Sequence, residues 1–174
     1  SIDHSIDYIC SAANDFAVIS ASYVAEKLGL PGYDSFQTTL MLHQKDEFKK
    51  IASELKLTIP KYLSCSLNEK NIIKNNYINL PLIVKPVDLT GGKGITKVSR
   101  IKELREAIDK AFSASKAKRI IIEEYIDGSL HSFSTIIIGK VVAFYFSDNE
   151  FLPFDPFHVT ASFSPSTNID EIKN

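Results

Sequence analysis

The sequence predicts an α+β fold, in which helices come first and a mixed or antiparallel sheet follows. In the first 80 residues, apolar residues recur at helical spacing. After residue 80, short runs rich in β-branched residues alternate with turns, and FSTIII and VVAFYF flank a Gly-Lys pair that is typical of a hairpin. This order favours α+β over a doubly wound parallel sheet, with a structural boundary expected near residue 80.

Three helices are expected in the first part. The first begins after Asn14, which can cap it, and ends at Gly29. A second is expected from about Ser35 to Leu57, and a third begins at SLNEKNII, where Ser66 and Glu69 form a capping box. The apolar faces of the first two are expected to be Phe16, Ile19, Tyr23 and Val24, and Phe48, Ile51, Ala52 and Leu55.

Short strands and one helix are expected in the second part. In PLIVKPV (81–87), the two-residue period of a strand places Lys85 on one face with Ile83 and Val87, opposite Leu82 and Val84. The tail from residue 148 to 174 shows no clear element. The further elements are strands at GITKVS, RIIIEEYI, FSTIII and VVAFYF, and a helix marked by Leu104, Ala107, Ile108 and Ala111.

Composition excludes several classes of partner and site. Lys and Arg number 20 against 21 acidic residues, a net charge of −1, so no strong field attracts nucleic acid or an anionic membrane. No apolar run reaches the ~18 residues that span a bilayer. The acidic N-terminus is unlike a signal peptide, so a cytoplasmic location is expected. Cys10 and Cys65 are expected to be free, buried thiols, the alternative being a disulfide between them, and the four scattered histidines have no metal-binding spacing.

The stretch LPLIVKPVDLTGGKGITKVS (80–99) places one lysine in a buried strand and another in a glycine turn. Lys85 needs an anionic partner, because an unpaired buried charge is costly. In the loop from Thr90 to Gly94, glycines permit positive φ and let backbone N–H groups point at an anion, which suits a polyphosphate. The alternative is a hairpin turn with a snorkelling Lys85 and an exposed Lys93. The loop is neither a Walker A motif nor a GxGxxG dinucleotide motif.

The stretch IIIEEYIDG (120–128) is an apolar strand that runs into two acids. A strand leaving the core can offer backbone groups to a purine edge, and Ile126 is a candidate for this contact. The carboxylate of Glu123 or Glu124 can accept a proton from the exocyclic amine of the purine. The alternative is an ordinary strand end with solvated acids.

In this order and at this spacing, the two stretches resemble the ATP-grasp superfamily. Its members carry a strand ending in (I/V)(I/V)KP, a mobile glycine loop, a helix and an EE(Y/F)(I/L)xG hinge. Upstream, NDFAVISASYVAEKLGLPG looks like the end of the pre-ATP-grasp domain, and MLHQKDEFKKIASELKLTIPKY looks like the family's helix and connector. Downstream, FHVTASFSPST is similar to a segment near the substrate in carbamoyl-phosphate-synthase-like members.

The resemblance implies an incomplete ATP-grasp fold in four parts. Residues 1–32 end the pre-ATP-grasp domain, and residues 33–80 form the helical part and connector. Residues 81–128 form the ATP-binding lobe with its glycine loop and hinge, and residues 129–174 begin the C-terminal lobe.

Motif positions imply the site residues. Lys85 and Lys45 resemble the two lysines that contact ATP phosphates, although Gln44 stands where the family usually has Asp; the alternative for Lys45 is a solvated helix lysine. Glu123 resembles the acceptor of the adenine amine, and the Glu124 side chain is expected in water. The loop over the phosphates is Thr90, Gly91, Gly92, Lys93 and Gly94, and the hinge backbone is Glu124, Tyr125 and Ile126.

Two positions depart from the family pattern. Leu130 stands where many members have a Glu that binds the ribose, and His131 is expected to make the sugar contact instead, the alternative being an ordinary strand histidine. Family members hold Mg²⁺ with a Glu and a Glu-x-Asn pair far downstream of the hinge. No such set of hard oxygen ligands follows His131, so no metal ligand is assigned and a truncated chain is expected.

The resemblance implies the ATP-binding portion of an ATP-dependent ligase. In such enzymes ATP phosphorylates a carboxylate or bicarbonate to an acyl phosphate, which an amine or ammonia attacks. The expected ligands are ATP, Mg²⁺ and a small carboxylate, and a homo-oligomer is left open. No catalytic residue is assigned, and the 174-residue chain alone is expected to be inactive. The alternatives are a non-catalytic nucleotide-binding or regulatory module, or a plain interaction domain.

Overall fold

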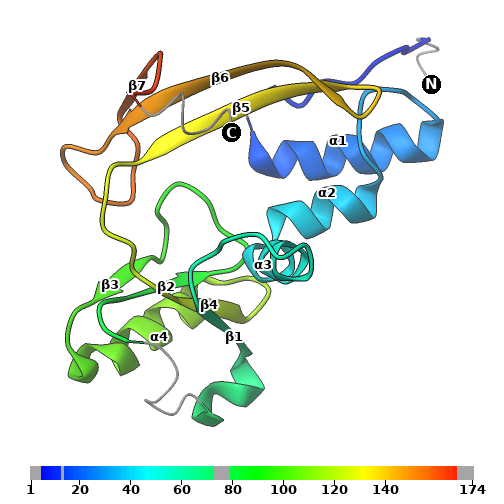
Figure 1. The fold of residues 1–174 in the computed structure, drawn as a ribbon. Helices are drawn as coiled ribbons and strands as arrows, with labels where there is room; N and C mark the ends of the chain where they lie inside the picture. The colour runs from blue at the N-terminus through cyan, green and yellow to red at the C-terminus, as the bar shows by residue number, and fades with distance from the viewer. Residues whose placement is uncertain (1–4, 13, 73–78, 168–174) are drawn as a thin grey trace. The chain divides into compact units, whose positions relative to one another are not determined.

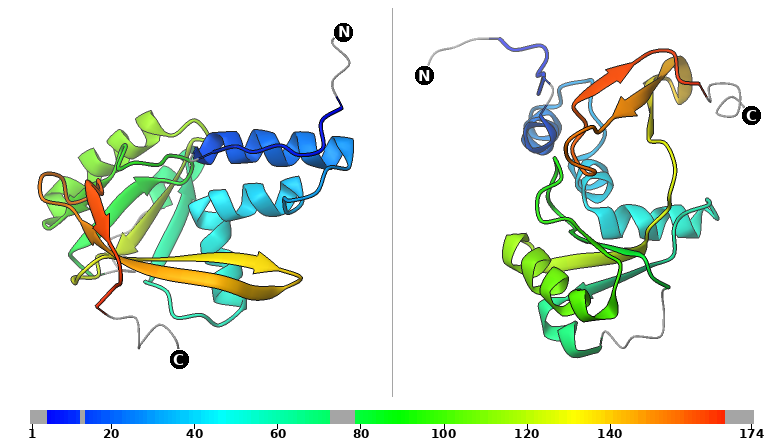
Figure 2. Two further views of the ribbon diagram at one scale, coloured as in Figure 1. Left: turned by 90° about the horizontal axis from the view of Figure 1, so that it is seen from above. Right: turned by 90° about the vertical axis from the view of Figure 1, so that its left-hand side faces the viewer.

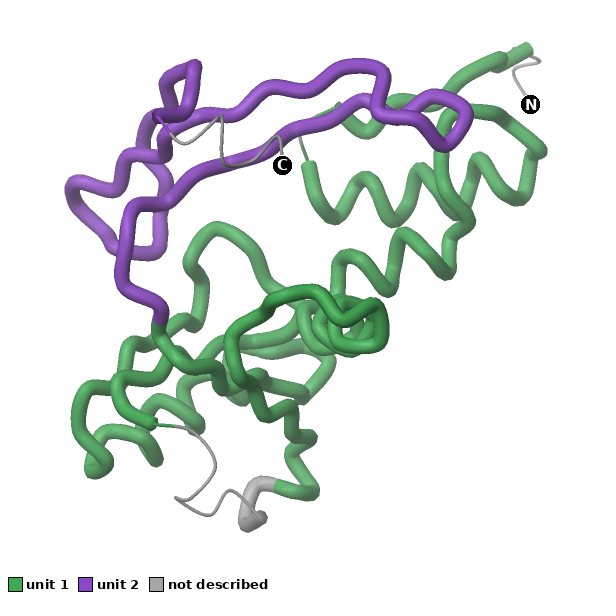
Figure 3. The backbone as a smooth tube through the Cα atoms, viewed as in Figure 1, with its two compact units in different colours: residues 1–125 green, residues 126–174 purple. Residues whose placement is uncertain are grey.

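The computed structural model describes residues 5–12, 14–72 and 79–167 of the chain. The chain divides into two compact units, residues 1–125 and 126–174, which are described separately (Figure 3). The expected boundary near residue 80 is wrong as a division between units. Strand β1 (Tyr62–Ser66), which precedes residue 80, pairs along its whole length with β4 (Arg119–Glu124) in one sheet.

Helix α1 (Asp15–Leu28) begins and ends as predicted. The Asn14 side chain accepts hydrogen bonds from the N–H groups of Phe16 and Ala17, and Gly29 ends the helix at φ 66°. Its expected apolar face is largely wrong, because Phe16 and two other members of that face are exposed. The side chains that α1 buries are small instead: Ala21, Ser22 and Ala25.

The expected helix from Ser35 to Leu57 is two helices, α2 (Phe36–His43) and α3 (Lys45–Glu54). They are separated at Gln44, which is extended at φ −83° and ψ 117°. Tertiary contacts explain the break. The N–H of Lys45 donates to the Val87 carbonyl at 3.1 Å, and the Gln44 side chain accepts from the Arg119 guanidinium.

The segment after β1 begins a 3₁₀ helix, η1 (Leu67–Ile72), rather than an α-helix. The expected capping contact is half present. The Glu69 carboxylate accepts from the Ser66 N–H at 3.0 Å, as a capping box requires. The Ser66 hydroxyl, however, donates to the same carboxylate at 2.8 Å.

The first unit contains a four-stranded antiparallel sheet, covered on one face by a single helix (Figure 1). This helix is α4 (Leu104–Ala114), at the predicted position. The strand order is β1-β4-β2-β3, where β2 is Leu82–Pro86 and β3 is Thr96–Val98. The core between sheet and helix consists of Cys65, Leu82, Val84, Val98, Leu104, Ala107, Ile108, Ala111, Phe112, Ile120 and Ile122.

Helix α3 contacts β4 on the opposite face of this sheet (Figure 2). Lys85 and Glu123 lie on this face, because β2 and β4 pair Ile83 with Glu123 and Lys85 with Ile121. Leu82 and Val84 point into the core on the other face, as predicted. The sheet therefore separates an apolar layer under α4 from a charged layer under α3.

Arg119 fastens α3 to the start of β4. Its guanidinium lies 3.0 Å from the Asp46 carboxylate and 3.3 Å from that of Glu47. The Asp46 side chain is only 7% exposed, so Arg119 is the cation that compensates a buried carboxylate. Arg119 thus fixes the helix that carries Lys45.

The second unit is a three-stranded antiparallel sheet in the order β5-β6-β7. Strands β5 (His131–Ile138) and β6 (Val141–Phe151) form the predicted hairpin, and both turn residues, Gly139 and Lys140, have positive φ. The tail is more ordered than predicted, because β6 extends past residue 148 and β7 (Ala161–Phe163) pairs with its end. Much of the hairpin is exposed and apolar: Ile136, Ile137, Ile138, Val141, Val142, Phe144 and Phe146.

The cysteines and the helices can be compared with the expectations of buried thiols and of no membrane span. Both cysteines are free thiols, as expected, but only Cys65 is buried, whereas Cys10 is exposed. Burial raises the pKa of the Cys65 thiol to about 11. Within the described part of the chain, no helix has the length and apolar character that a membrane span requires.

Replacing Arg119 tests the fastening of α3. The change Arg119→Met should lower the free energy of unfolding by about 3 kcal/mol, because it leaves the Asp46 carboxylate buried without a cation. Urea denaturation followed by circular dichroism measures this loss. Arg105→Met on the exposed face of α4 is the matched control and should change stability little. Equal losses in the two variants would contradict the role given to Arg119.

Candidate functional site

The centre of the charged layer is an ion pair between neighbouring strands. The Lys85 ammonium lies 2.7 Å from Oε2 of Glu123, and the two side chains are 19% and 6% exposed. Lys85 is therefore paired inside the protein, and the alternative of a snorkelling lysine in solvent is wrong. The pair places two predicted site residues in direct contact.

A second lysine, which the sequence analysis missed, reaches the same carboxylate. The Lys49 ammonium lies 3.2 Å from Oε1 of Glu123, and its side chain is 11% exposed. This contact is an ion pair without hydrogen-bond geometry, because the buried Oε1 has no hydrogen-bond partner among the described residues. The helical period contained the signal, since Lys49 follows Lys45 by one turn and shares its side of α3.

Lys45 lies beside this pair and is held by the strand end and the loop that follows it. Its N–H donates to Val87, and its ammonium donates to the Leu89 carbonyl. Burial, together with the positive charge of Lys85, lowers the pKa of Lys45 below its ordinary value. The alternative of a fully solvated helix lysine is therefore wrong. Lys45 and Lys85 form a site in which an added anion would relieve repulsion.

The glycine loop joins β2 to β3. Gly91, Gly92 and Gly94 have φ values of 63°, 74° and 74°, which glycine adopts at no steric cost. A Cβ on Gly94 would lie 2.8 Å from the Pro86 ring and 2.9 Å from the Ala114 methyl, so only glycine fits there. Lys93 is exposed, and Thr90 is half-buried.

Asp88 anchors the start of this loop. Its carboxylate accepts from the Ser115 hydroxyl at 2.8 Å and from the Ala117 N–H at 2.8 Å. Burial raises the pKa of Asp88, but these hydrogen bonds and others from the backbone outweigh it and hold that pKa below its ordinary value. The loop is thus attached to the segment that follows α4.

The hinge residues that follow Glu123 hold the connector to the sheet. Glu124 accepts from the Lys61 N–H with its carboxylate and donates its own N–H to the Lys61 carbonyl, both at 3.0 Å. The Glu124 side chain is half-exposed, which agrees in part with the expected side chain in water, but one of its oxygens is bound to the connector. Tyr125 donates its N–H to Pro81, and the Lys97 ammonium lies 3.6 Å from the centre of its ring.

Ile126 and His131, the remaining predicted site residues, belong to the second unit. Ile126 is 64% exposed. The His131 ring lies between two hydroxyls, with Nε2 2.7 Å from Ser129 and Nδ1 2.7 Å from Ser166. His131 is therefore fixed in orientation at the start of β5.

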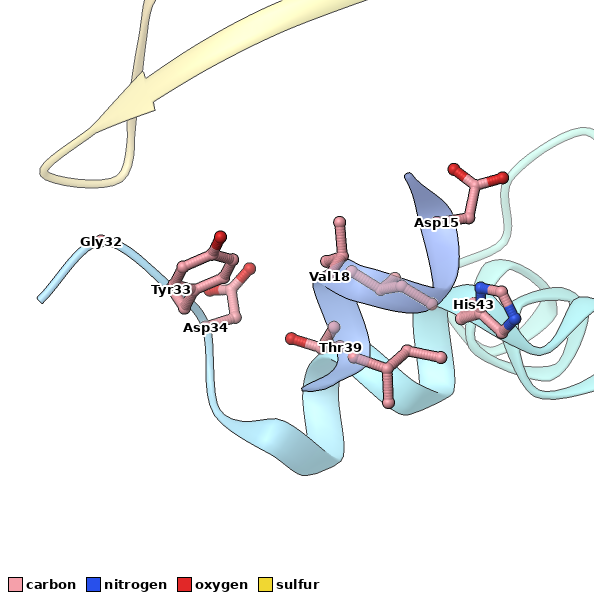
Figure 4. A pocket seen from close by; sticks show the side chains of 9 residues that line it. Asp15, Val18, Gly32, Tyr33, Asp34, Thr39 and His43 are labelled. Atoms are coloured by element: carbon pink, nitrogen blue, oxygen red, sulfur yellow. The ribbon is translucent and has the colours of Figure 1, made fainter. Parts of the chain in front are cut away.

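A separate depression of about 350 Å³ lies along α1, α2 and the segment between them (Figure 4). Asp15 and His43 line it from the two helices, and Tyr33 and Asp34 line it from the joining segment. None of the predicted site residues lines it. Among the described residues, no three His, Cys, Asp or Glu side chains lie close enough together to hold a metal ion.

The family described as D-ala D-ala ligase C-terminus matches residues 39–143. This range includes the three lysines of the site (Lys45, Lys49 and Lys85), the glycine loop and the hinge. The chain belongs to this ATP-grasp family. The resemblance inferred from the two motifs is thus confirmed.

Curated relatives of this ATP-grasp chain match parts of it. The carbamoyl phosphate synthase large chain of Thermoanaerobacter sp. (strain X514) is 28% identical over 110 residues, which are 62% of this chain and 10% of that protein. The D-alanine–D-alanine ligase of Parabacteroides distasonis is 30% identical over 116 residues, which are 64% of this chain and 33% of that protein.

Solved structures confirm an incomplete ATP-grasp fold. The D-alanine–D-alanine ligase from Helicobacter pylori superposes with a TM-score of 0.61 at 20% identity, over 90% of this chain and 50% of that one. This ATP-grasp chain therefore spans between about a tenth and a half of the length of these relatives.

Substitutions at two glycines separate the energetic cost of a left-handed backbone from the cost of the close contact at Gly94. Gly94→Ala should lower the free energy of unfolding by about 2 to 4 kcal/mol, the sum of a left-handed backbone and the contact with Pro86 and Ala114. Gly91→Ala, whose Cβ would meet open space, is the control and should cost about 1 to 2 kcal/mol. Denaturant unfolding measures both, and equal losses would show that the close contact has no energetic role.

Proposed function

We propose that this chain is the ATP-binding portion of a ligase that joins a small carboxylate, or bicarbonate, to an amine or ammonia through an acyl phosphate. The observation that carries the proposal is the buried ion pair of Lys85 with Glu123, together with the repulsion between Lys85 and the neighbouring Lys45, in a chain of the ATP-grasp family. The relatives named above are ligases and synthases by their own names, which supports the reaction class.

The lysines are suited to the phosphate end of the nucleotide. Burial and mutual repulsion make two ammonium groups side by side unfavourable without an anion, and a triphosphate supplies several negative charges. In phosphoryl transfer the protein mainly positions the reactants and neutralises developing charge. We assign this role to Lys45, Lys85 and the loop from Thr90 to Gly94.

Glu123 is suited to the base end. No donor in the described part of the chain makes a hydrogen bond to its buried Oε1, so this oxygen is an acceptor that a bound ligand can satisfy. The exocyclic amine of adenine is such a donor. Guanine carries a carbonyl at the same position, which would face the carboxylate with another acceptor. The site should therefore prefer adenine nucleotides.

The roles of Mg²⁺, Ile126 and His131 are less defined than those of the lysines and Glu123. Mg²⁺, when bound, neutralises phosphate charge in such reactions, but the described residues offer no cluster of three ligands for it, so no residue here is assigned to it. The backbone role of Ile126 and the sugar contact of His131 stay predictions. The residues of this chain bind and orient substrate, and none is assigned a bond-making step.

A non-catalytic nucleotide-binding module is the second candidate. Leu130 favours it, because many ATP-grasp members have a ribose-binding Glu at this position. Both candidates require ATP binding and differ in whether a carboxylate becomes phosphorylated. A plain interaction domain would show no response to nucleotide.

Nucleotide preference tests the proposal. ATP with Mg²⁺, at 100 times its dissociation constant, should raise the free energy of unfolding by about 2.7 kcal/mol, measured by thermal unfolding. GTP at the same concentration should stabilise the chain much less, and Glu123→Gln should narrow the difference because an amide can also donate. Exposed Glu106→Gln is the control. Absence of stabilisation by ATP would contradict the proposal.

Lys45 is expected to reduce the stability of the ligand-free chain and to strengthen ATP binding. Lys45→Met is expected to maintain or raise the melting temperature of the ligand-free chain, because it removes an unfavourable buried charge, and to reduce the stabilisation by ATP at least by half. Exposed Lys50→Met on the same helix should do neither.

The pH dependence gives an independent check on Lys45. Between the lowered pKa of Lys45 in the folded chain and its ordinary value of 10.5, the unfolded chain holds more of the Lys45 proton than the folded chain, so the stability of the ligand-free chain should rise with pH there. This contribution should be missing in Lys45→Met. An unchanged profile would show that the folded state does not lower the pKa of Lys45.

A further inference from the structure

Glu123 has one lysine on each of its oxygens. Lys85 reaches Oε2 from the neighbouring strand, and Lys49 reaches Oε1 from α3. The carboxylate and both ammonium groups are largely buried, with side-chain exposures of 6%, 19% and 11% in the order Glu123, Lys85, Lys49. A single carboxylate thus has two cations from two separate elements.

The proposed function requires Lys85 to bind a phosphate as well as Glu123. The Lys85 ammonium has three N–H donors, so it can bind a phosphate oxygen beside its 2.7 Å contact with Glu123, but its charge is then shared and neutralises the carboxylate less. A buried carboxylate that loses compensating charge is destabilised, so nucleotide binding would be opposed. The site needs another cation that stays on Glu123.

Lys49 meets this need better than Lys45. The Lys45 ammonium donates to the Leu89 carbonyl in the loop, whereas the Lys49 ammonium forms an ion pair with Glu123. Lys49 also stands on a helix that Arg119 fastens to β4 through Asp46, so its position relative to Glu123 is fixed.

We propose that Lys49 is a positioning residue that retains Glu123 when Lys85 turns to the nucleotide phosphates. This inference rests on the proposed function. Lys49 acts through Glu123 and makes no contact with the nucleotide. Lys85 can then serve the phosphates without leaving an unpaired charge beside the base.

Affinities for ATP with Mg²⁺ and for adenosine, measured by calorimetry on the 174-residue chain, test this role. Lys49→Met should weaken ATP binding about tenfold or more, because Lys85 is then retained by Glu123. Adenosine binding should change less than about twofold, because adenosine offers no phosphate. Lys49→Arg should restore ATP binding, and Lys50→Met is the matched control. Equal losses for ATP and adenosine would reveal a merely structural role and overturn the inference.

A second pair of variants avoids an unpaired buried carboxylate and remains informative if Lys49→Met does not fold. Once Glu123→Gln has removed the negative charge, adding Lys49→Met should change ATP affinity less than about twofold. A further tenfold loss in that background would show direct contact between Lys49 and the nucleotide, and would overturn the inference.

ATP binding by the unaltered chain distinguishes a failure of the proposed function from a failure of this inference. If it does not bind ATP, the proposed function and this inference both fail. If it binds ATP and Lys49→Met binds ATP equally well, only the inference fails.

Discussion

The buried carboxylate of Glu123 is the charge on which the arrangement of the first unit depends. It lies on the face of the sheet away from the apolar core, where a carboxylate is tolerable only with cations beside it. Lys85 from β2 and Lys49 from α3 provide them. The same contacts that make Glu123 tolerable gather the lysines into one place, so the structural requirement and the proposed binding chemistry coincide.

The position of α3 follows from a second set of charges at the edge of the same layer. Arg119, the first residue of β4, forms ion pairs with Asp46 and Glu47 of α3. The extended Gln44 lets the N–H of Lys45 reach the Val87 carbonyl. A helix continued through Gln44 would use that N–H internally. The break therefore directs α3 toward Glu123.

Local patterns predicted the features that depend on local geometry. The two-residue period of PLIVKPV placed Lys85 opposite Leu82 and Val84, and Asn14 and Gly29 marked the ends of α1. The Gly-Lys pair marked the hairpin of the second unit. The order of the two motifs indicated the ATP-grasp family, which neither motif alone could have specified.

Features that depend on distant partners were missed. The break at Gln44 results from contacts with Val87 and Arg119, and the side chain of Glu124 is engaged by Lys61 across 63 positions. The buried face of α1 depends on what packs against it, which helical spacing alone does not reveal. Lys49 could have been predicted from the sequence, because a lysine one turn after Lys45 lies on the same side of the helix.

Three attachments of the glycine loop limit how far it can move. Asp88 is bound to the segment after α4, Leu89 is held by Lys45, and Gly94 is seated between Pro86 and Ala114. Only residues 90–93 remain between these anchors. Four residues reach at most about 14 Å when fully extended, so the loop can serve a ligand lying directly above the end of β2 and none farther away.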